Sequence, residues 1–246
     1  MPKYRMFAAR KSKQDQMKNN LYVKFARLIY MEAKRGGPNP EANFRLKTAI
    51  ANARAAQMPN ENIERAIRKA TGDTGSEHYE EVVYEGYAPG GIAVMVRCLT
   101  DNRNRTAAEV RAVFNRRGGH LGETGCVAYL FDEKGVLFLE KKPNQGLSED
   151  DLTLLALECG AEDVRTYEDG YEIVTDPRDF QRVKTELEAR GLSFSLAAVR
   201  WVPKSWVEVP QEAADRLEEM VEAFEALDDV QDVFHNAIIN RTATEG

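Results

Sequence analysis

Apolar residues recur at helical spacing in three stretches of the first third of the chain, around residues 21–29, 46–53 and 60–69. This spacing predicts three helices that share one core. Gly and Pro residues at 36–40 separate the first two stretches, and Pro59-Asn60 opens the third. In the third helix the basic side chains at 65, 68 and 69 are predicted to point outward.

The pattern changes after the Gly-rich segment 72–76, which we expect to be a linker. Short apolar or alternating runs then predict strands at 79–87, 92–99, 126–131 and 136–140. Between the second and third runs, Thr106-Ala-Ala-Glu109 has the form of a capping box, which predicts a helix start at Thr106.

The segment 134–200 reads as β-α-β-β-α-β, the ferredoxin-like order. Ser148 is expected to cap its first helix, and Asp176-Pro177 to start its second. The tail offers a helix after Pro210 and a strand after Asp229. To complete a sheet, this strand must join the strands near residues 80–131.

We therefore expect an α+β fold: an N-terminal three-helix domain followed by two ferredoxin-like α/β domains, the third inserted in the second. The expected boundaries are 1–75 for the basic helical domain, 76–133 plus 201–241 for the discontinuous second domain, and 134–200 for the inserted domain. A chain of 246 residues is long enough for two or three domains.

Charge divides the chain at the same linker. Residues 1–72 hold 16 Lys and Arg against 5 Asp and Glu, a net charge of +11. The remaining residues hold 18 against 35, a net charge of −17, so the overall −6 hides the asymmetry. Such a basic segment favours contact with a polyanion such as nucleic acid. The alternative is a basic helical domain that docks on acidic domains of its own chain.

Other features narrow the class of protein. No apolar run approaches the roughly 20 residues of a membrane span, and we expect no membrane partner and no small-molecule substrate. Cys98, Cys126 and Cys159 are far apart and are expected to be reduced core residues. The three histidines are scattered, so no metal site and no cofactor is expected. No catalytic constellation is evident, and we expect no enzyme.

Six arginines lie between residues 97 and 117, several of them around a predicted strand-to-helix connection at 101–106. Arginines beside a helix N-terminus suit a phosphate site. Equally, they could pair with acidic residues of the protein's own surface. The four glycines of 118–125 match no phosphate-loop motif and follow a helix, so we interpret them as turn residues.

The first 18 residues combine six basic side chains with one acid, Asp15, and interleave Tyr4 and Phe7. This combination suits phosphate contact and stacking on bases. The alternative role for the two aromatic residues is to anchor the segment on the helical domain. Together with the arginine-rich segment, the candidate nucleic-acid contacts are Lys3, Tyr4, Arg5, Arg10, Lys11, Lys13, Lys18, Lys24, Arg103, Arg105, Arg111, Arg116 and Arg117.

Several motifs together resemble the YebC/PmpR family. They are Gly36-Gly-Pro-Asn-Pro40, Met58-Pro-Asn-Glu-Asn-Ile-Glu-Arg-Ala-Ile67, Tyr84-Glu-Gly-Tyr-Ala-Pro-Gly-Gly91, Leu99-Thr-Asp-Asn-Arg-Asn-Arg-Thr106, Gly118-Gly-His-Leu-Gly122 and Val127-Ala-Tyr-Leu-Phe131. The chain departs from the family at its start. Lys3-Tyr4 stands where Lys-Trp is usual, and Ala8-Ala-Arg-Lys11 stands where the family has Lys-His-Arg-Lys.

The resemblance implies three domains, the third inserted in the second, and no enzymatic activity. It implies a DNA-binding transcriptional regulator of the bacterial cytoplasm or, as in the related mitochondrial proteins, a translational activator at the ribosome. We therefore expect a non-enzymatic nucleic-acid-binding regulator of gene expression, with DNA as the target and ribosomal RNA or the ribosome as the alternative. We place the bacterial cytoplasm ahead of the mitochondrial matrix. An adaptor that binds acidic proteins is the third reading.

Overall fold

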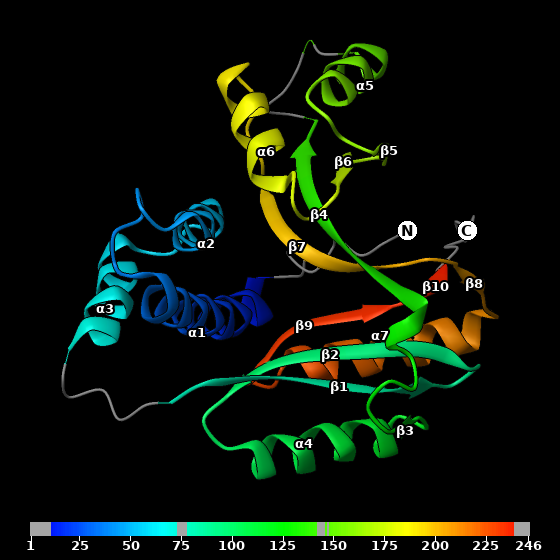
Figure 1. Cartoon of the computed structure of the whole chain (residues 1–246). Helices are drawn as coiled ribbons and strands as arrows, with labels where there is room; N and C mark the ends of the chain where they lie inside the picture. The colour runs from blue at the N-terminus through cyan, green and yellow to red at the C-terminus, as the bar shows by residue number, and fades with distance from the viewer. Residues whose placement is uncertain (1–10, 73–77, 142–145, 147, 239–246) are drawn as a thin grey trace. The chain divides into compact units, whose positions relative to one another are not determined.

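The computed structural model describes residues 11–72, 78–141, 146 and 148–238. Its fold is α+β, with a helical N-terminal region followed by two four-stranded sheets, as the sequence predicts (Figure 1). Contacts divide the chain into two compact units. The first unit comprises residues 1–28, 74–132 and 202–246, and the second comprises 29–73 and 133–201. The predicted three-domain boundaries remain a proposal, and the boundary near 75 lies outside the described residues.

The long helix α1 (Lys11–Gly36) contributes residues to both units. The other elements of the first unit are β1 (Glu80–Ala88), β2 (Ile92–Thr100), α4 (Arg103–Arg116), β3 (His120–Leu121), a 3-10 helix (Ala128–Leu130), β8 (Val207–Glu208), α7 (Gln211–Glu225), β9 (Val230–His235) and β10 (Ala237–Ile238). Those of the second unit are α2 (Phe44–Ala55), α3 (Asn60–Thr71), α5 (Glu149–Glu158), β5 (Asp163–Thr166), β6 (Gly170–Thr175) and α6 (Phe180–Ala189). Two strands, β4 (Phe131–Glu140) and β7 (Leu196–Pro203), begin or end in the first unit and lie mainly in the second.

The first unit contains an antiparallel sheet with the order β3-β1-β2-β9. Its central strands β1 and β2 form a hairpin, and its last strand comes from the tail, as predicted. Helices α4 and α7 pack on one face of this sheet, where Phe114 and Phe224 meet edge to face at 5.0 Å. The residues between β3 and α7 build the second sheet, so the second sheet is an insertion in the chain of the first (Figure 1).

The inserted sheet has the antiparallel order β5-β6-β4-β7 and carries helices α5 and α6, which is the ferredoxin-like arrangement predicted for 134–200. Helix α2 contacts this sheet within the second unit. The Asn52 carboxamide donates to the Ala197 carbonyl at 2.7 Å and accepts from the Ala197 N–H at 3.0 Å. Phe44 packs edge to face on Phe180, with ring centroids 6.1 Å apart.

The predicted strand at 126–131 is wrong. This segment forms a turn and the 3-10 helix, and β4 begins only at Phe131. The cause is the buried carboxylate of Glu85, which accepts hydrogen bonds from the N–H groups of Val127 and Ala128 at 2.9 and 2.8 Å. Because these amides are bound by a side chain, they cannot join a strand ladder.

Two helix starts are displaced from their predicted positions. Helix α4 begins one turn before Thr106 because the Asn102 carboxamide caps it, accepting from the Arg105 N–H at 3.1 Å. The Thr106 hydroxyl instead bonds to Asp229. Helix α6 begins at Phe180 because Asp176 first closes a turn, in which its carboxylate accepts from the Arg178 N–H at 2.9 Å. The Ser148 cap of α5 is confirmed.

Cys98, Cys126 and Cys159 are free thiols. Cys98 and Cys159 are fully buried, as expected of core residues, whereas Cys126 is only partly buried. Within the described ranges, no helix is both long and apolar enough to cross a membrane.

Candidate nucleic-acid interface

The predicted N-terminal contacts are only partly within the described chain. Lys3, Tyr4, Arg5 and Arg10 lie outside the described residues. Three further candidates, Lys11, Lys13 and Lys18, lie on α1, but the structure does not describe their side chains. These seven residues therefore stay predictions.

Lys24 has a structural environment that suits anchoring. Its side chain is 8% exposed, and its ammonium donates to the backbone carbonyl of Glu225, the last residue of α7, at 2.7 Å. Burial lowers the pKa of Lys24, and the acidic residues nearby only partly oppose that effect. A cation at a helix C-terminus is favourable. Lys24 therefore attaches α1 to the end of α7, and we leave it out of the proposed interface.

Arg105 is likewise engaged within the protein. Its guanidinium bonds Asp229 at 2.8 Å and Asp101 at 2.7 Å. Asp229 is only 3% exposed and also accepts from Arg27 of α1 and from the Thr106 hydroxyl. These bonds tie α1, the start of α4 and the α7–β9 connection to one carboxylate. For Arg105, pairing with the protein's own acids is therefore the reading that the geometry supports.

Arg103 and Arg117 make looser pairs at the surface. The Arg103 guanidinium is 3.8 Å from the Glu80 carboxylate, and that of Arg117 is 2.7 Å from the Glu219 carboxylate. All four side chains are largely exposed, with relative exposures between 41% and 66%. Exposed pairs of this kind contribute at most about 1 kcal/mol, so both arginines can exchange their partner for a phosphate at little cost.

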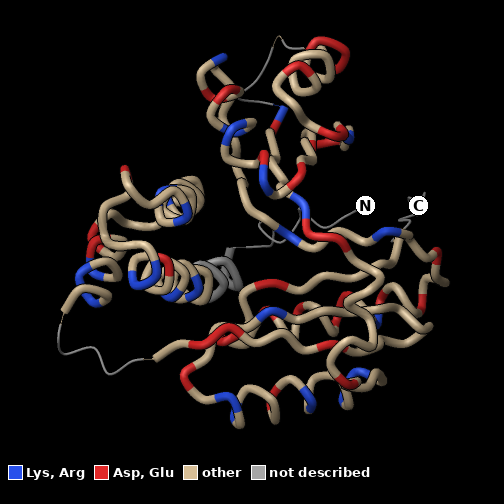
Figure 2. Tube along the Cα trace, viewed as in Figure 1, with Lys and Arg blue, Asp and Glu red and all other residues tan. Residues whose placement is uncertain are grey.

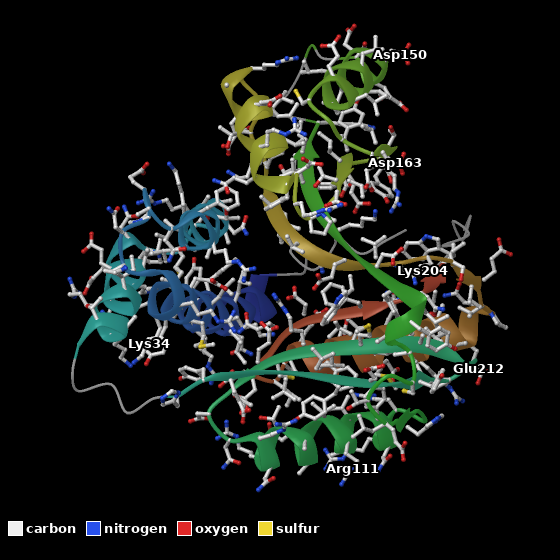
Figure 3. The ribbon with its side chains drawn as sticks, viewed as in Figure 1. Lys34, Arg111, Asp150, Asp163, Lys204 and Glu212 are labelled. Atoms are coloured by element: carbon white, nitrogen blue, oxygen red, sulfur yellow. The ribbon has the colours of Figure 1, made fainter. Side chains whose placement is uncertain are left out.

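Arg111 and Arg116 are the candidates without an acidic partner in the described part of the chain. Both are exposed on α4. Figure 2 shows the basic positions of α4 spread along its length, and Figure 3 labels Arg111 on the side of the helix that faces away from the strands. Buried Val110 and Phe114 hold the opposite side of α4 on the sheet. The amphipathic packing of α4 thus turns these two guanidinium groups to solvent.

Further exposed cations lie on the helices of the second unit and were not among the candidates. They are Arg45, Lys47 and Arg54 on α2, and Arg65, Arg68 and Lys69 on α3. Several pair with acids one turn away, as Arg65 does with Glu61 at 3.0 Å. Their outward helical spacing was visible in the sequence, and it is the signal by which they could have been selected.

Glu85 is a further residue that the sequence analysis did not select. It is 4% exposed, and its carboxylate accepts hydrogen bonds from the N–H groups of Gly125, Val127 and Ala128 at 2.7, 2.9 and 2.8 Å. In the sequence, Glu85 lies between Tyr84 and Tyr87 in a predicted strand, and this unusual position of an acid was the signal by which it could have been selected. Across the described residues, no group of three His, Cys, Asp or Glu side chains is placed to hold a metal ion.

The structure defines a class of α+β protein. Its members have a helical N-terminal region, an inserted ferredoxin-like domain and exposed arginines on α4. Comparisons with known proteins identify the family to which the chain belongs. The family model for the TACO1/YebC N-terminal domain matches residues 2–73, and that for the TACO1/YebC second and third domain matches residues 79–237. The chain therefore belongs to the TACO1/YebC family, and the resemblance in its motifs is confirmed.

Individual relatives cover almost the whole chain. A "probable transcriptional regulatory protein" of Pelotomaculum thermopropionicum is 49% identical over 95% of this chain and 96% of its own length. The "probable transcriptional regulatory protein YrbC" of Bacillus subtilis is 47% identical over 95% of this chain and 97% of its own. The crystal structure of the conserved hypothetical protein Aq1575 from Aquifex aeolicus is 45% identical, with a TM-score of 0.88 and 98% of each chain covered.

Proposed function

We propose that this protein is a non-enzymatic, DNA-binding regulator of gene expression that acts in the bacterial cytoplasm. The names of its relatives support a role in transcription. The observation that carries the binding proposal is the pair Arg111 and Arg116, exposed on α4 with no acidic partner in the described chain. The net charge of +11 in residues 1–72 adds a second source of phosphate contacts.

Phosphate contact is the chemistry that these residues offer. A guanidinium group binds phosphate oxygens through two parallel N–H donors and keeps its charge at any physiological pH. Such contacts release condensed counterions and bind nucleic acid without reading its sequence. The base-specific contacts that a regulator of particular genes needs would have to come from other residues.

The test is a salt titration of binding, followed by fluorescence anisotropy of a labelled DNA duplex. The double variant Arg111→Ala/Arg116→Ala should reduce the slope of log K against log salt by about 1.8, because each lost phosphate contact removes about 0.9. The matched control is Arg178→Ala/Arg190→Ala, which removes the same charge from arginines paired with Asp176 and Glu158. An equal effect in both variants, or none in either, contradicts the role of α4.

A translation factor that binds RNA at the ribosome is the second candidate. Exposed rings near the 3-10 helix, above all Tyr129 at 65% exposure, favour it because unpaired bases in RNA stack on aromatic side chains. The same titration with a structured ribosomal RNA fragment separates the two. Tighter binding of RNA than of duplex DNA at equal salt supports the translation factor, and the reverse supports the transcriptional regulator.

A further inference from the structure

Three aromatic rings gather at the β3 edge of the first unit. Tyr87 of β1 and His120 of β3 are cross-strand partners, and their rings stack with centroids 5.3 Å apart and planes inclined by 29°. The Tyr87 hydroxyl donates to the Cys126 carbonyl at 3.0 Å, and the Ala128 N–H donates to the Glu85 carboxylate at 2.8 Å, so the backbone of Tyr129 is held beside β1 close to Tyr87. His120 and Tyr129 are both exposed.

Tyr87 and His120 lie on the sheet face opposite the one that α4 and α7 cover. Tyr84 and Ala88 of β1 pack in the core under α4 and α7. Because side chains alternate along a strand, Glu85 and Tyr87 point to the other face. Met95 and Phe234 are buried toward the middle of this face, whereas His120 on the edge strand β3 and Tyr129 on the 3-10 helix are exposed. The β3 edge is therefore the part that a ligand can reach.

The backbone beneath the rings is held unusually tightly. The three hydrogen bonds that Glu85 accepts fix the turn before Tyr129, and the Tyr87 hydroxyl donates to the Cys126 carbonyl at 3.0 Å. A Cβ atom at Gly119 would lie 2.3 Å from the Tyr87 carbonyl oxygen, and one at Gly122 would lie 2.5 Å from the Cys126 sulfur. The glycines of 118–125 therefore let the segment approach β1 closely.

We propose that Tyr87, His120 and Tyr129 form a stacking platform for the unpaired bases of single-stranded nucleic acid. The inference rests on the proposed function, since it assumes that the chain binds nucleic acid, and it adds the state of the strand that is bound. Every base has a flat π-face, so a pre-ordered set of rings binds bases of any sequence. Pre-ordering by Glu85 and the glycines lowers the entropy cost of binding.

The surroundings favour bases over an apolar protein partner. Exposed neighbours of the rings in sequence are polar or charged, as at Glu123 and Thr124. The backbone N–H of Lys204 donates to the Leu130 carbonyl at 2.9 Å, which places this exposed lysine beside the 3-10 helix. The Lys204 ammonium pairs with Asp132 at 3.4 Å, and both side chains are half exposed, so a phosphate can replace this carboxylate at little cost. Isolated rings among polar groups suit a base, whereas protein docking needs a contiguous apolar patch.

The experiment uses the full chain and single-stranded 12-nucleotide probes of oligo-dT and oligo-rU, each with one 2-aminopurine whose fluorescence falls when it stacks. An abasic strand of the same length reports phosphate contacts alone. His120→Ala/Tyr129→Ala should weaken binding to both base-containing probes by about 5- to 100-fold and abolish the fluorescence change. Its binding to the abasic strand should stay as in the wild type.

The conservative variant Tyr129→Phe keeps the ring and should bind like the wild type. Glu85→Gln weakens the turn beneath Tyr129. Its affinity for the base-containing probes should lie between that of the wild type and that of His120→Ala/Tyr129→Ala. If wild type and the double alanine variant bind the base-containing probes equally, the platform is wrong while the proposed function stands. If the wild type binds no duplex, no single strand and no abasic strand, the proposed function itself fails. The tighter of the two single strands identifies DNA or RNA as the source of the bases.

Discussion

At the scale of single residues, Asp229 shows how one buried carboxylate organises distant parts of the first unit. It bonds Arg27 of α1, Arg105 of α4 and the Thr106 hydroxyl, and its backbone carbonyl accepts from the Leu99 N–H at 2.8 Å. Burying a charge is unfavourable unless it is fully hydrogen-bonded. This carboxylate satisfies that condition with two guanidinium groups and the hydroxyls of Thr106 and Thr100, so the site stabilises only when all its partners are in place.

The stability of the protein should depend on pH through Asp229. Burial alone would raise the pKa of this carboxyl, but hydrogen bonds from Arg105, Thr106 and Arg27 outweigh burial and lower it. A lowered folded-state pKa gives stability that is present above the ordinary value of 3.8 and is lost as the pH falls below it. Asp229→Asn should destabilise the protein by about 2 to 3 kcal/mol at pH 7, and by less at pH 3, as measured by urea unfolding.

Asp101→Asn is the matched control, because Asp101 bonds the same Arg105 but is 46% exposed. An exposed pair contributes at most about 1 kcal/mol, so this variant should unfold almost like the wild type at both pH values. Equal destabilisation by the two substitutions, or a loss at Asp229 that does not shrink in acid, would show that Asp229 is not the organising charge.

The role of Arg105 also shows what the sequence could not decide. Its local surroundings fit a phosphate site and a surface ion pair equally well. The partner that decides between them, Asp229, lies 124 residues further along the chain. Arg111 and Arg116 could be assigned to an exposed face from spacing alone, because Val110 and Phe114 mark the buried side of the same helix.

At the scale of elements, local signals predicted local structure well. The Ser148 cap, the helix after Pro59 and the two consecutive strands β5 and β6 in the predicted β-α-β-β-α-β order depend on residues within a few positions of one another. The segment 126–131 failed for the opposite reason. Its apolar residues resemble a strand, but the carboxylate of Glu85, 42 residues before Val127, binds the amides of Val127 and Ala128 and forces a turn.

Helix α2 offers a test of how an element is attached within the second unit. The Asn52 carboxamide bonds both backbone groups of Ala197, which is 2% exposed. Asn52→Ala would leave a buried N–H and a buried carbonyl without partners, and we expect a loss of about 2 kcal/mol in the free energy of unfolding. The Ala197 amide should exchange its hydrogen faster, as measured by mass spectrometry or NMR.

The exposed Arg54 on the same helix provides the control for that substitution. Arg54→Ala removes a larger side chain but only a surface hydrogen bond to Asn60 at 3.3 Å, so stability should change by less than about 0.5 kcal/mol. If the Ala197 amide exchanges its hydrogen no faster in Asn52→Ala than in the wild type, water replaces the carboxamide without cost, and other contacts hold α2.

At the scale of the whole molecule, the division of charge sets how the protein meets a polyanion. Residues 1–72 carry a net charge of +11 and the remainder −17. The acidic remainder repels phosphates, so a nucleic acid should be oriented toward the basic region before any specific contact forms. Lys24 and Arg27 make contacts within the protein. The predicted attraction therefore comes from the other cations of residues 1–72, and we expect those nearest the N-terminus to contribute most.

Reversing two of those charges tests this view of the molecule. Arg10→Glu/Lys11→Glu should weaken binding to unrelated DNA duplexes by about 10- to 100-fold at 0.1 M salt, because about two phosphate contacts are lost. The loss should be similar for every sequence, since phosphates carry no base information. The control Arg178→Glu/Arg190→Glu changes the net charge by the same amount within the acidic remainder and should have a much smaller effect. If both reversals weaken binding equally, net charge alone governs affinity; if the first leaves affinity unchanged at low salt, the basic N-terminal region does not contact the nucleic acid.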